Sequence, residues 1–336
     1  MIANPVLVET IRNNWVENRH RGAFCITNDH GEIIASAGDI EQSIFPRSAI
    51  KSIQALALFR SGAVEKFSLD PQEIALACAS HRGEAAHIKG VKKFLEKISC
   101  CETDLECGAH FPSDPVARAA MHKAGVKPGP IHNNCSGKHS GMLAVARALD
   151  APIKGYIGLD HPVQKLVRQC IEDLIGEDLT TDRYGTDGCS IPTFAAPLKA
   201  FAFGFARAGT GNGLNEKTAA AMRQIFAAAT SHPFLVGGTG SFDSEVMKIF
   251  NGAIMSKRGA EGVYCGSIPA LKLGYALKCD DGSMDAAEIM MATLLLDIVQ
   301  PDAAQRQFLQ QRTHKIYKNW RKMEVATMGP SRELSF

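Results

Sequence analysis

The 336-residue sequence contains no run of about 18 consecutive apolar residues, the length that a membrane-spanning helix requires. Residues 1–21 also lack the apolar core of a signal peptide, because charged and amide side chains interrupt them. Blocks of basic residues are missing too, and the formal net charge is only +2. The sequence therefore gives no electrostatic support for binding nucleic acid or an anionic membrane. We expect a cytoplasmic protein with neither of these among its partners.

The sequence also lacks the character of a small disulfide-stabilised domain, although it contains ten cysteines. The chain is long, and 45% of its residues are hydrophobic, so it can build a large core without covalent cross-links. We expect reduced thiols, most of them buried as small apolar side chains, with a minority able to bind metal.

Strand-like sequence is concentrated near the two ends of the chain. Two short segments rich in β-branched residues flank 28–31, which has the composition of a turn and predicts a hairpin. Near the other end, 262–268 and 270–279 are again typical of strands. Helical patterns dominate between and after them. The predicted helices comprise 46–60, one that begins after an N-cap at Asp70, 84–98, 115–124, 138–149, 161–175, 215–230, 243–250, 285–299 and 303–312.

This distribution predicts an α+β fold, with one antiparallel sheet built from N- and C-terminal strands and flanked by helices. We expect 1–336 to form a single catalytic unit. A helical insert at approximately 65–235 would pack on a sheet formed by 20–40 and 260–280. That layout would leave a cleft between sheet and insert, where small ligands often bind.

Ser48 and Lys51 form the first candidate catalytic pair. They are three positions apart in the predicted helix that begins at Pro46, so their side chains would share one face. The helix N-terminus offers unpaired N–H groups that stabilise a developing oxyanion, and a neutral lysine can take the serine proton. The same spacing also occurs by chance on exposed helix faces, so the pair alone does not identify an enzyme.

Two further segments strengthen the hypothesis. Ser80 lies in a polar turn, where it could relay a proton between Lys51 and a leaving group or simply cap the next helix. Lys257 could supply a second cation that keeps Lys51 neutral, or belong to a charged turn. The order resembles the S-x-x-K, S-x-N and K-T-G motifs of serine β-lactamases and penicillin-binding proteins. The fit is incomplete, because Ser80 is followed by His-Arg and Lys257 by Arg-Gly.

Five motifs together resemble the rhizobial-type, or class 3, L-asparaginases, a family related in fold and chemistry to serine β-lactamases and glutaminases. They are, in chain order, FPRSAIK at 45–51, SHRGE at 80–84, NNCSGKH at 133–139, DGC at 187–189 and K-x-GAEG at 257–262. The resemblance spans nearly the whole chain. It implies a homodimer that hydrolyses L-asparagine to L-aspartate and ammonia. It also implies that Ser48 is the nucleophile and Lys51 its base, with Ser80 and Lys257 as a second pair in the proton network.

Cys135, Lys138 and Cys189 raise the question of a metal. Spacing alone shows two short-range pairs on glycine-bearing loops, consistent with zinc thiolates or with two buried cysteines near a helix start. The resemblance implies that zinc is bound near the active site by the residues that match these three. Since Ser48 already supplies the nucleophile, we expect such an ion to order the substrate pocket rather than to activate water.

Substrate binding is less defined by the sequence. Asp187 is a candidate for the α-amino group of the substrate, and Arg47 or His139 for its carboxylate. Two rival functions stay open at this point. One is a β-lactamase-like or glutaminase-type serine hydrolase that acts on another amide, and the other is a non-catalytic zinc-binding protein.

Overall fold

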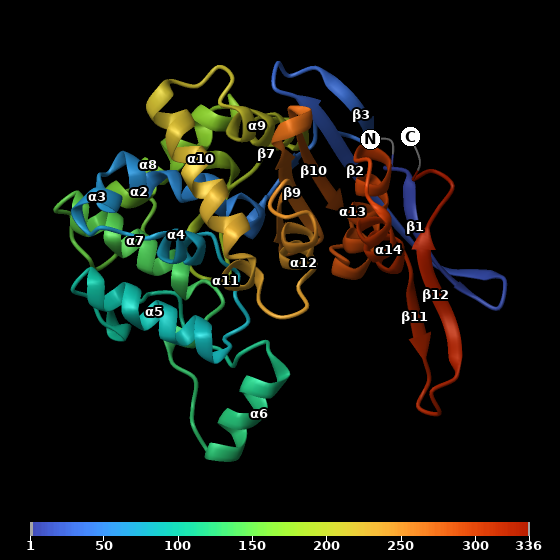
Figure 1. Ribbon diagram of the computed structural model, residues 1–336, viewed down its shortest axis with the longest axis horizontal. Helices are drawn as coiled ribbons and strands as arrows, with labels where there is room; N and C mark the ends of the chain where they lie inside the picture. Colours follow the sequence, from blue (N-terminus) through green and yellow to red (C-terminus); the bar gives the residue numbers. More distant parts are fainter. Residues whose placement is uncertain (1–2, 335–336) are drawn as a thin grey trace. The chain divides into compact units, whose positions relative to one another are not determined.

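A computed structural model describes residues 3–334 and divides the chain into two compact units. The first, here called the sheet unit, comprises Met1–Ala49, Ala196–Ala206 and Lys257–Phe336. The second, the helical unit, comprises Ile50–Ala195 and Arg207–Ser256. Strands from both ends of the chain build one antiparallel sheet, so the predicted α+β class is confirmed (Figure 1).

The sheet has eight strands in the order β11-β12-β1-β2-β10-β9-β8, with β3 also paired to β2. The long strand β2 forms the link between the two halves of the sheet, because its first part pairs with β1 and its second part with β10 and β3. A separate short ladder joins β4 (Ser43–Ile44) to β7 (Ala196–Pro197). The strands of the main sheet are β1 (Val6–Arg12), β2 (Trp15–Asn28), β3 (Ile33–Ala37), β8 (Met255–Gly259), β9 (Val263–Ile268), β10 (Leu273–Cys279), β11 (Lys315–Lys318) and β12 (Glu324–Pro330).

Two helices cover part of this sheet. α13 (Met284–Ile298) packs against β1, β9, β10 and β12, and α14 (Ala303–Arg312) packs on α13 (Figure 1). α13 is apolar around most of its circumference because it is covered on both sides. α9 (Leu198–Thr210) lies directly against β10, where a Cβ on Gly274 would be 2.1 Å from the carbonyl oxygen of Ala202. Glycine is therefore required at this contact.

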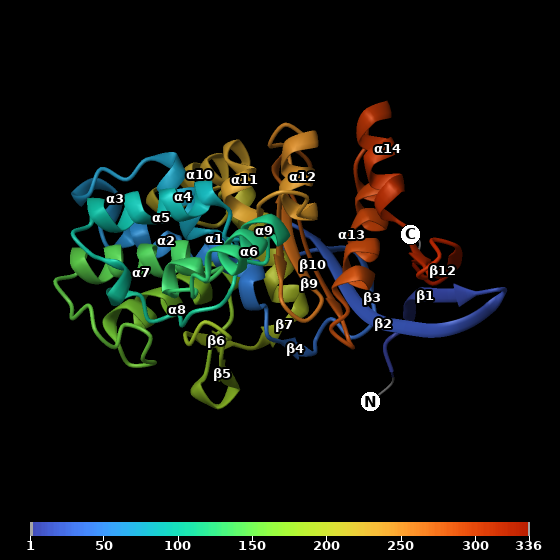
Figure 2. The same cartoon turned by 90° about the horizontal axis from the view of Figure 1, so that it is seen from below.

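The helical unit is assembled around α7 (Ser136–Ala148), which is buried over almost its whole length. A Cβ on Gly137 would lie 2.3 Å from the carbonyl oxygen of Leu76, so the start of α7 and the end of α4 are in direct backbone contact. Figure 2 shows the β5–β6 hairpin as a loop that projects from this unit. Its other elements are α1 (Lys51–Gln54), α2 (Leu56–Arg60), α3 (Ala63–Lys66), α4 (Pro71–Ala77), α5 (Ala85–Lys97), α6 (Pro115–Ala124), α8 (Pro162–Ile175), α10 (Glu216–Ser231), α11 (Pro233–Gly237), α12 (Phe242–Ile249), β5 (Tyr184–Thr186) and β6 (Pro192–Phe194).

Most predicted helices are confirmed, with ends that shift by one or two residues. The N-cap at Asp70 is confirmed as well, since its side chain accepts from the backbone N–H of Glu73 while the Glu73 side chain accepts from that of Asp70. The continuous helix predicted for 46–60 is wrong. The chain instead forms a 3₁₀ turn, η1 (Arg47–Ile50), followed by α1 and α2, because Arg47 has a left-handed φ of 50° that a helix beginning at Pro46 cannot contain.

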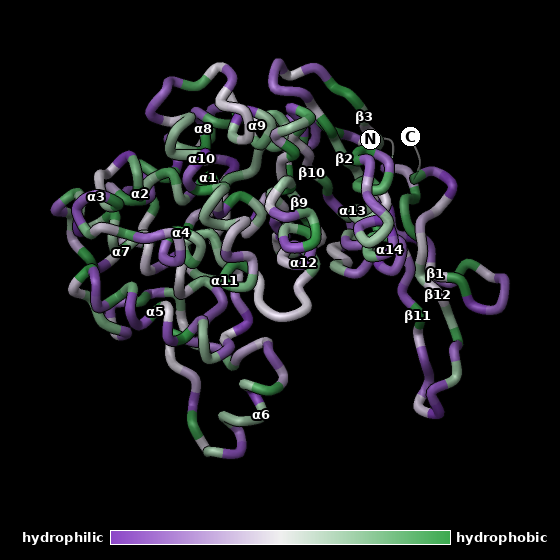
Figure 3. The backbone as a smooth tube through the Cα atoms, in the orientation of Figure 1, coloured by the Kyte–Doolittle hydropathy of each residue, from purple (hydrophilic) through white to green (hydrophobic). Residues whose placement is uncertain are grey.

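Several elements lie outside the sequence predictions, among them β1, β8, β11, β12 and α9. The tube in Figure 3 is mostly hydrophilic along β11, an edge strand whose residues do not alternate clearly between apolar and polar. No disulfide joins any of the ten cysteines, and eight of them are buried. Within residues 3–334, no helix combines the length and apolar character needed to cross a membrane.

Candidate functional site

The sheet unit contains Ser48 and Lys257. Ser48 lies in η1, and Lys257 is a fully buried residue of β8 whose Nζ donates to the carbonyl oxygen of Arg258 at 2.9 Å. A Cβ on Gly259 would lie only 2.5 Å from the carbonyl oxygen of Pro46, which precedes Ser48 by two positions. The glycine of the K-x-G motif thus lets β8 approach the turn that carries Ser48. Lys257 belongs to a strand rather than to the turn that the sequence also allowed.

The helical unit places Lys51 and Ser80 together, as the sequence suggested. The Nζ of Lys51 donates to the carbonyl oxygen of Ala79 at 2.5 Å, to the Oγ of Ser80 at 2.9 Å and to the Sγ of Cys135 at 3.1 Å. Lys51 is 1% exposed, so these three acceptors replace the water that an ammonium group would otherwise bind. Ser48 precedes Lys51 by three positions, where the chain passes from the sheet unit to the helical unit.

His81 fixes the turn that carries Ser80, a role that the sequence analysis did not assign. Its Nδ1 accepts from the backbone N–H of Gly83 at 3.2 Å, so the proton is on Nε2, which donates to the Oγ of Ser136 at 2.8 Å. Burial lowers the pKa of His81 well below its ordinary value, and the neighbouring His87 and Lys51 lower it further. The ring is therefore neutral and ties the Ser80 turn to the start of α7.

Cys135, Lys138 and Cys189 converge in the same unit. The Nζ of Lys138 is 2.8 Å from the Sγ of Cys189, and all three residues are buried. A hydrogen bond from Cys189 holds the pKa of the Cys135 thiol well below its ordinary value, although burial by itself would raise that pKa. Lys51 and Lys138 also lower the pKa of Cys135. The same bond to Cys135 raises the pKa of Cys189.

The residues proposed for substrate binding occupy different surroundings. Asp187 is half-buried in the β5–β6 turn, where its Oδ1 accepts from the backbone N–H of Gly188 at 2.9 Å. His139 is fully buried, and its Nδ1 lies 2.6 Å from the hydroxyl oxygen of Tyr156. Burial lowers the pKa of His139, with Lys138 adding to the effect, so the ring is neutral. Arg47 belongs to the sheet unit and is half-buried. The binding roles of Asp187, His139 and Arg47 stay predictions.

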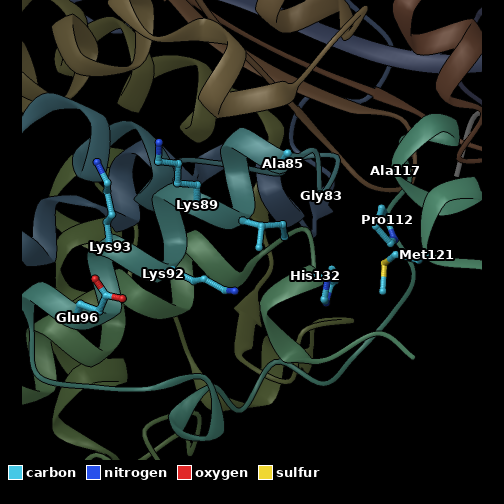
Figure 4. Close-up of a pocket in the computed structure, with 11 residues that line it drawn as sticks. Gly83, Ala85, Lys89, Lys92, Lys93, Glu96, Pro112, Ala117, Met121 and His132 are labelled. Atoms are coloured by element: carbon cyan, nitrogen blue, oxygen red, sulfur yellow. The ribbon is translucent and has the colours of Figure 1, made fainter. Parts of the chain in front are cut away.

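A groove of about 570 Å³ lies elsewhere in the helical unit, between α5 and the segment 112–132 (Figure 4). Three lysines of α5 project on one of its sides, namely Lys89, Lys92 and Lys93. None of the ten predicted site residues lines it, although Gly83 of the Ser80 turn does. The groove therefore does not replace the Lys51–Ser80 cluster as the candidate site.

Comparisons with known proteins point to one family. The family described as L-asparaginase II matches residues 8–330. No curated protein sequence matches the chain. Among solved structures, Mglu in its native form is 14% identical with a TM-score of 0.44, over 80% of this chain and 61% of Mglu. The chain thus spans less than two thirds of that protein.

Two further solved structures cover more of their own length. A beta-lactamase from Mycobacterium bovis is 13% identical with a TM-score of 0.42, over 79% of this chain and 89% of that one. The D-alanine carboxypeptidase AmpC from Burkholderia cenocepacia is 11% identical with a TM-score of 0.39, over 87% of this chain and 92% of that one.

Proposed function

Because the chain belongs to the L-asparaginase II family, and is thus an amidohydrolase with a small-molecule substrate, we propose that it hydrolyses L-asparagine to L-aspartate and ammonia. The observation that carries the proposal is the buried cluster in which Lys51 donates to Ser80. Lys51 follows Ser48 by three positions in the chain. A lysine held between a serine and a thiol can accept and return protons without exposure to water.

In this mechanism Ser48 attacks the side-chain amide of the substrate, and Lys51 takes the serine proton. Ammonia then leaves with a proton relayed through Ser80, and an aspartyl ester remains on Ser48. Water hydrolyses the ester by the reverse relay. Lys51 must be neutral to act as the base, and supplying a second cation stays the role proposed for Lys257.

We further propose that Cys135, Lys138 and Cys189 bind zinc. Two sulfur atoms and one amine nitrogen within a buried cluster can all donate an electron pair to zinc. Burial alone would lower the pKa of Lys138, but Cys189, Cys135 and Asp187 raise it, so binding must release its proton. When bound, zinc would supply positive charge that orders the pocket for a carboxylate or carbonyl oxygen. Metal analysis should find zinc in the purified protein and a loss of that zinc in Cys135→Ser, whereas equal zinc in both would contradict the assignment.

Ammonia release from L-asparagine, L-glutamine and a β-lactam tests the function directly. We expect asparagine to be hydrolysed with a kcat/KM roughly tenfold or more above that for glutamine, because one methylene changes the fit of a closed pocket by about this amount. Faster release from glutamine, or opening of the β-lactam alone, would favour a related amidohydrolase of different specificity. Absence of release from all three, with zinc still bound, would make the protein a metal-binding protein rather than this enzyme.

A homodimer completes the proposal and follows from the resemblance alone. Light scattering would contradict it by giving a molar mass of 36.2 kDa, that of one chain.

A further inference from the structure

A second group of possible metal ligands lies in the sheet unit, far along the chain from Cys135 and Cys189. It consists of His20 on β2, Cys279 at the end of β10, and Asp281 in the turn before α13. The antiparallel pairing of β2 and β10 brings these residues together, since Cys279 is the partner of Gly22 and the backbone N–H of Asp280 donates to the carbonyl oxygen of Arg21 at 2.9 Å.

The side chains of His20 and Cys279 both contact the carboxylate of Asp281. The Nδ1 of His20 lies 2.7 Å from Oδ2 of Asp281, and the Sγ of Cys279 donates to Oδ1 of Asp281 at 3.0 Å. One nitrogen, one sulfur and one oxygen atom from the three side chains all lie within 4.8 Å of one another. A cation that took the place of the thiol proton would find three ligand atoms already grouped.

Burial makes this group different from an ordinary surface contact. His20 is 9% exposed and Cys279 is fully buried, whereas the Asp281 side chain is 47% exposed and leaves a path from solvent. The Nε2 atom of His20 is buried and has no hydrogen-bond partner within residues 3–334. Within the described residues, the contact with Asp281 is therefore the one hydrogen bond that the ring makes.

We propose that His20, Cys279 and Asp281 form a second metal site, one that takes Zn²⁺ or a similar borderline divalent ion. Imidazole nitrogen, thiolate sulfur and carboxylate oxygen are the three ligand types that zinc uses in proteins, and water would complete a tetrahedral set. Mg²⁺ and Ca²⁺ prefer oxygen ligands and do not suit this group. The ion would release the proton of the Cys279 thiol, and the Nδ1 of His20 would bind the ion in the tautomer that carries the ring proton on Nε2. It would join β2 to the turn that leads into α13.

Cobalt(II) is a suitable probe, because it occupies zinc sites and gives absorption bands that report a thiolate ligand. The full chain, stripped of metal with a chelator and kept reduced, is titrated with Co²⁺ by equilibrium dialysis and absorbance. We expect Cys279→Ser to bind one Co²⁺ fewer than the unchanged protein. Cys265→Ser, which replaces another fully buried thiol in the same sheet, should bind as many as the unchanged protein.

Asp281→Asn and His20→Gln provide a test that keeps the thiol. Each should weaken Co²⁺ binding at this site by at least about tenfold, since each removes one of three protein ligands. Near-UV circular dichroism checks that each variant is folded. If Cys279→Ser and Asp281→Asn are folded and bind as many ions as the unchanged protein with the same affinity, the three residues form only a hydrogen-bonded network and the proposal is wrong. Its failure would leave the asparagine assay unaffected.

Discussion

Ser48→Ala is expected to reduce the turnover of L-asparagine by at least about 10³-fold while the fold is kept. The reason is that the mechanism has a single nucleophile, and without its hydroxyl no aspartyl ester can form. Ammonia release measures the loss. Mass spectrometry after rapid quenching should detect an added aspartyl group on the unchanged protein and none on Ser48→Ala.

Ser52→Ala is the matched control, because it makes the same exchange four positions further along the chain. The hydroxyl of Ser52 is buried and makes no hydrogen bond within the described residues. Its removal should leave kcat within about twofold and the stability unchanged or higher, since an unsatisfied hydroxyl is lost. Near-normal turnover by Ser48→Ala, or an equal loss in Ser52→Ala, would refute the nucleophile assignment.

The second large effect concerns Lys51. We expect Lys51→Met and Lys51→Arg each to lower kcat/KM by at least about 10³-fold. Methionine has no proton to exchange. Arginine keeps the positive charge but does not lose its proton in proteins, so it cannot serve as the base. Methionine should also destabilise the fold by about 1–3 kcal/mol for each buried acceptor left without a donor, of which Ala79 and Ser80 are two.

Lys66→Met serves as the control for Lys51. Lys66 is 45% exposed and donates to the carbonyl oxygen of Arg147 at the surface of the helical unit. Its loss should change kcat/KM by less than about twofold. Steady-state ammonia release and thermal unfolding of the three variants give the comparison. A folded Lys51→Met protein that retained more than a tenth of normal kcat/KM would show that Lys51 is structural and that another group takes the serine proton.

The features that the sequence predicted well are those decided by neighbours in the chain. The capping box at Asp70 needs only Asp70 and Glu73, and α6 begins at Pro115 and ends at Ala124, just before the left-handed Gly125. The strand β8 was not predicted, because Met-Ser-Lys-Arg-Gly shows no alternation and its pairing depends on β9. The left-handed conformation of Arg47, which breaks the predicted helix, also has no local signal.

In the candidate site too, features set by neighbours in the chain were predictable and contacts between distant residues were not. The spacing of Ser48 and Lys51 is local and was visible in the sequence. The contact between Lys51 and Cys135 joins residues 84 positions apart, and depends on the close backbone approach of α4 and α7 at Gly137. The role of His81 depends on a tautomer that only its two partners, Gly83 and Ser136, determine. Pattern and spacing carry no information on such contacts.

The pairing of β2 has a consequence for synthesis on the ribosome. Most of the helical unit is encoded between β2 and its partner β10, and β1 acquires its second neighbour only with β12, near the end of the chain. The nascent chain therefore emerges with strands whose edges have no partner until translation is almost complete. Such edges favour association with other chains, so products that stop before β10 should aggregate, and chaperones should bind the N-terminal strands while the helices form.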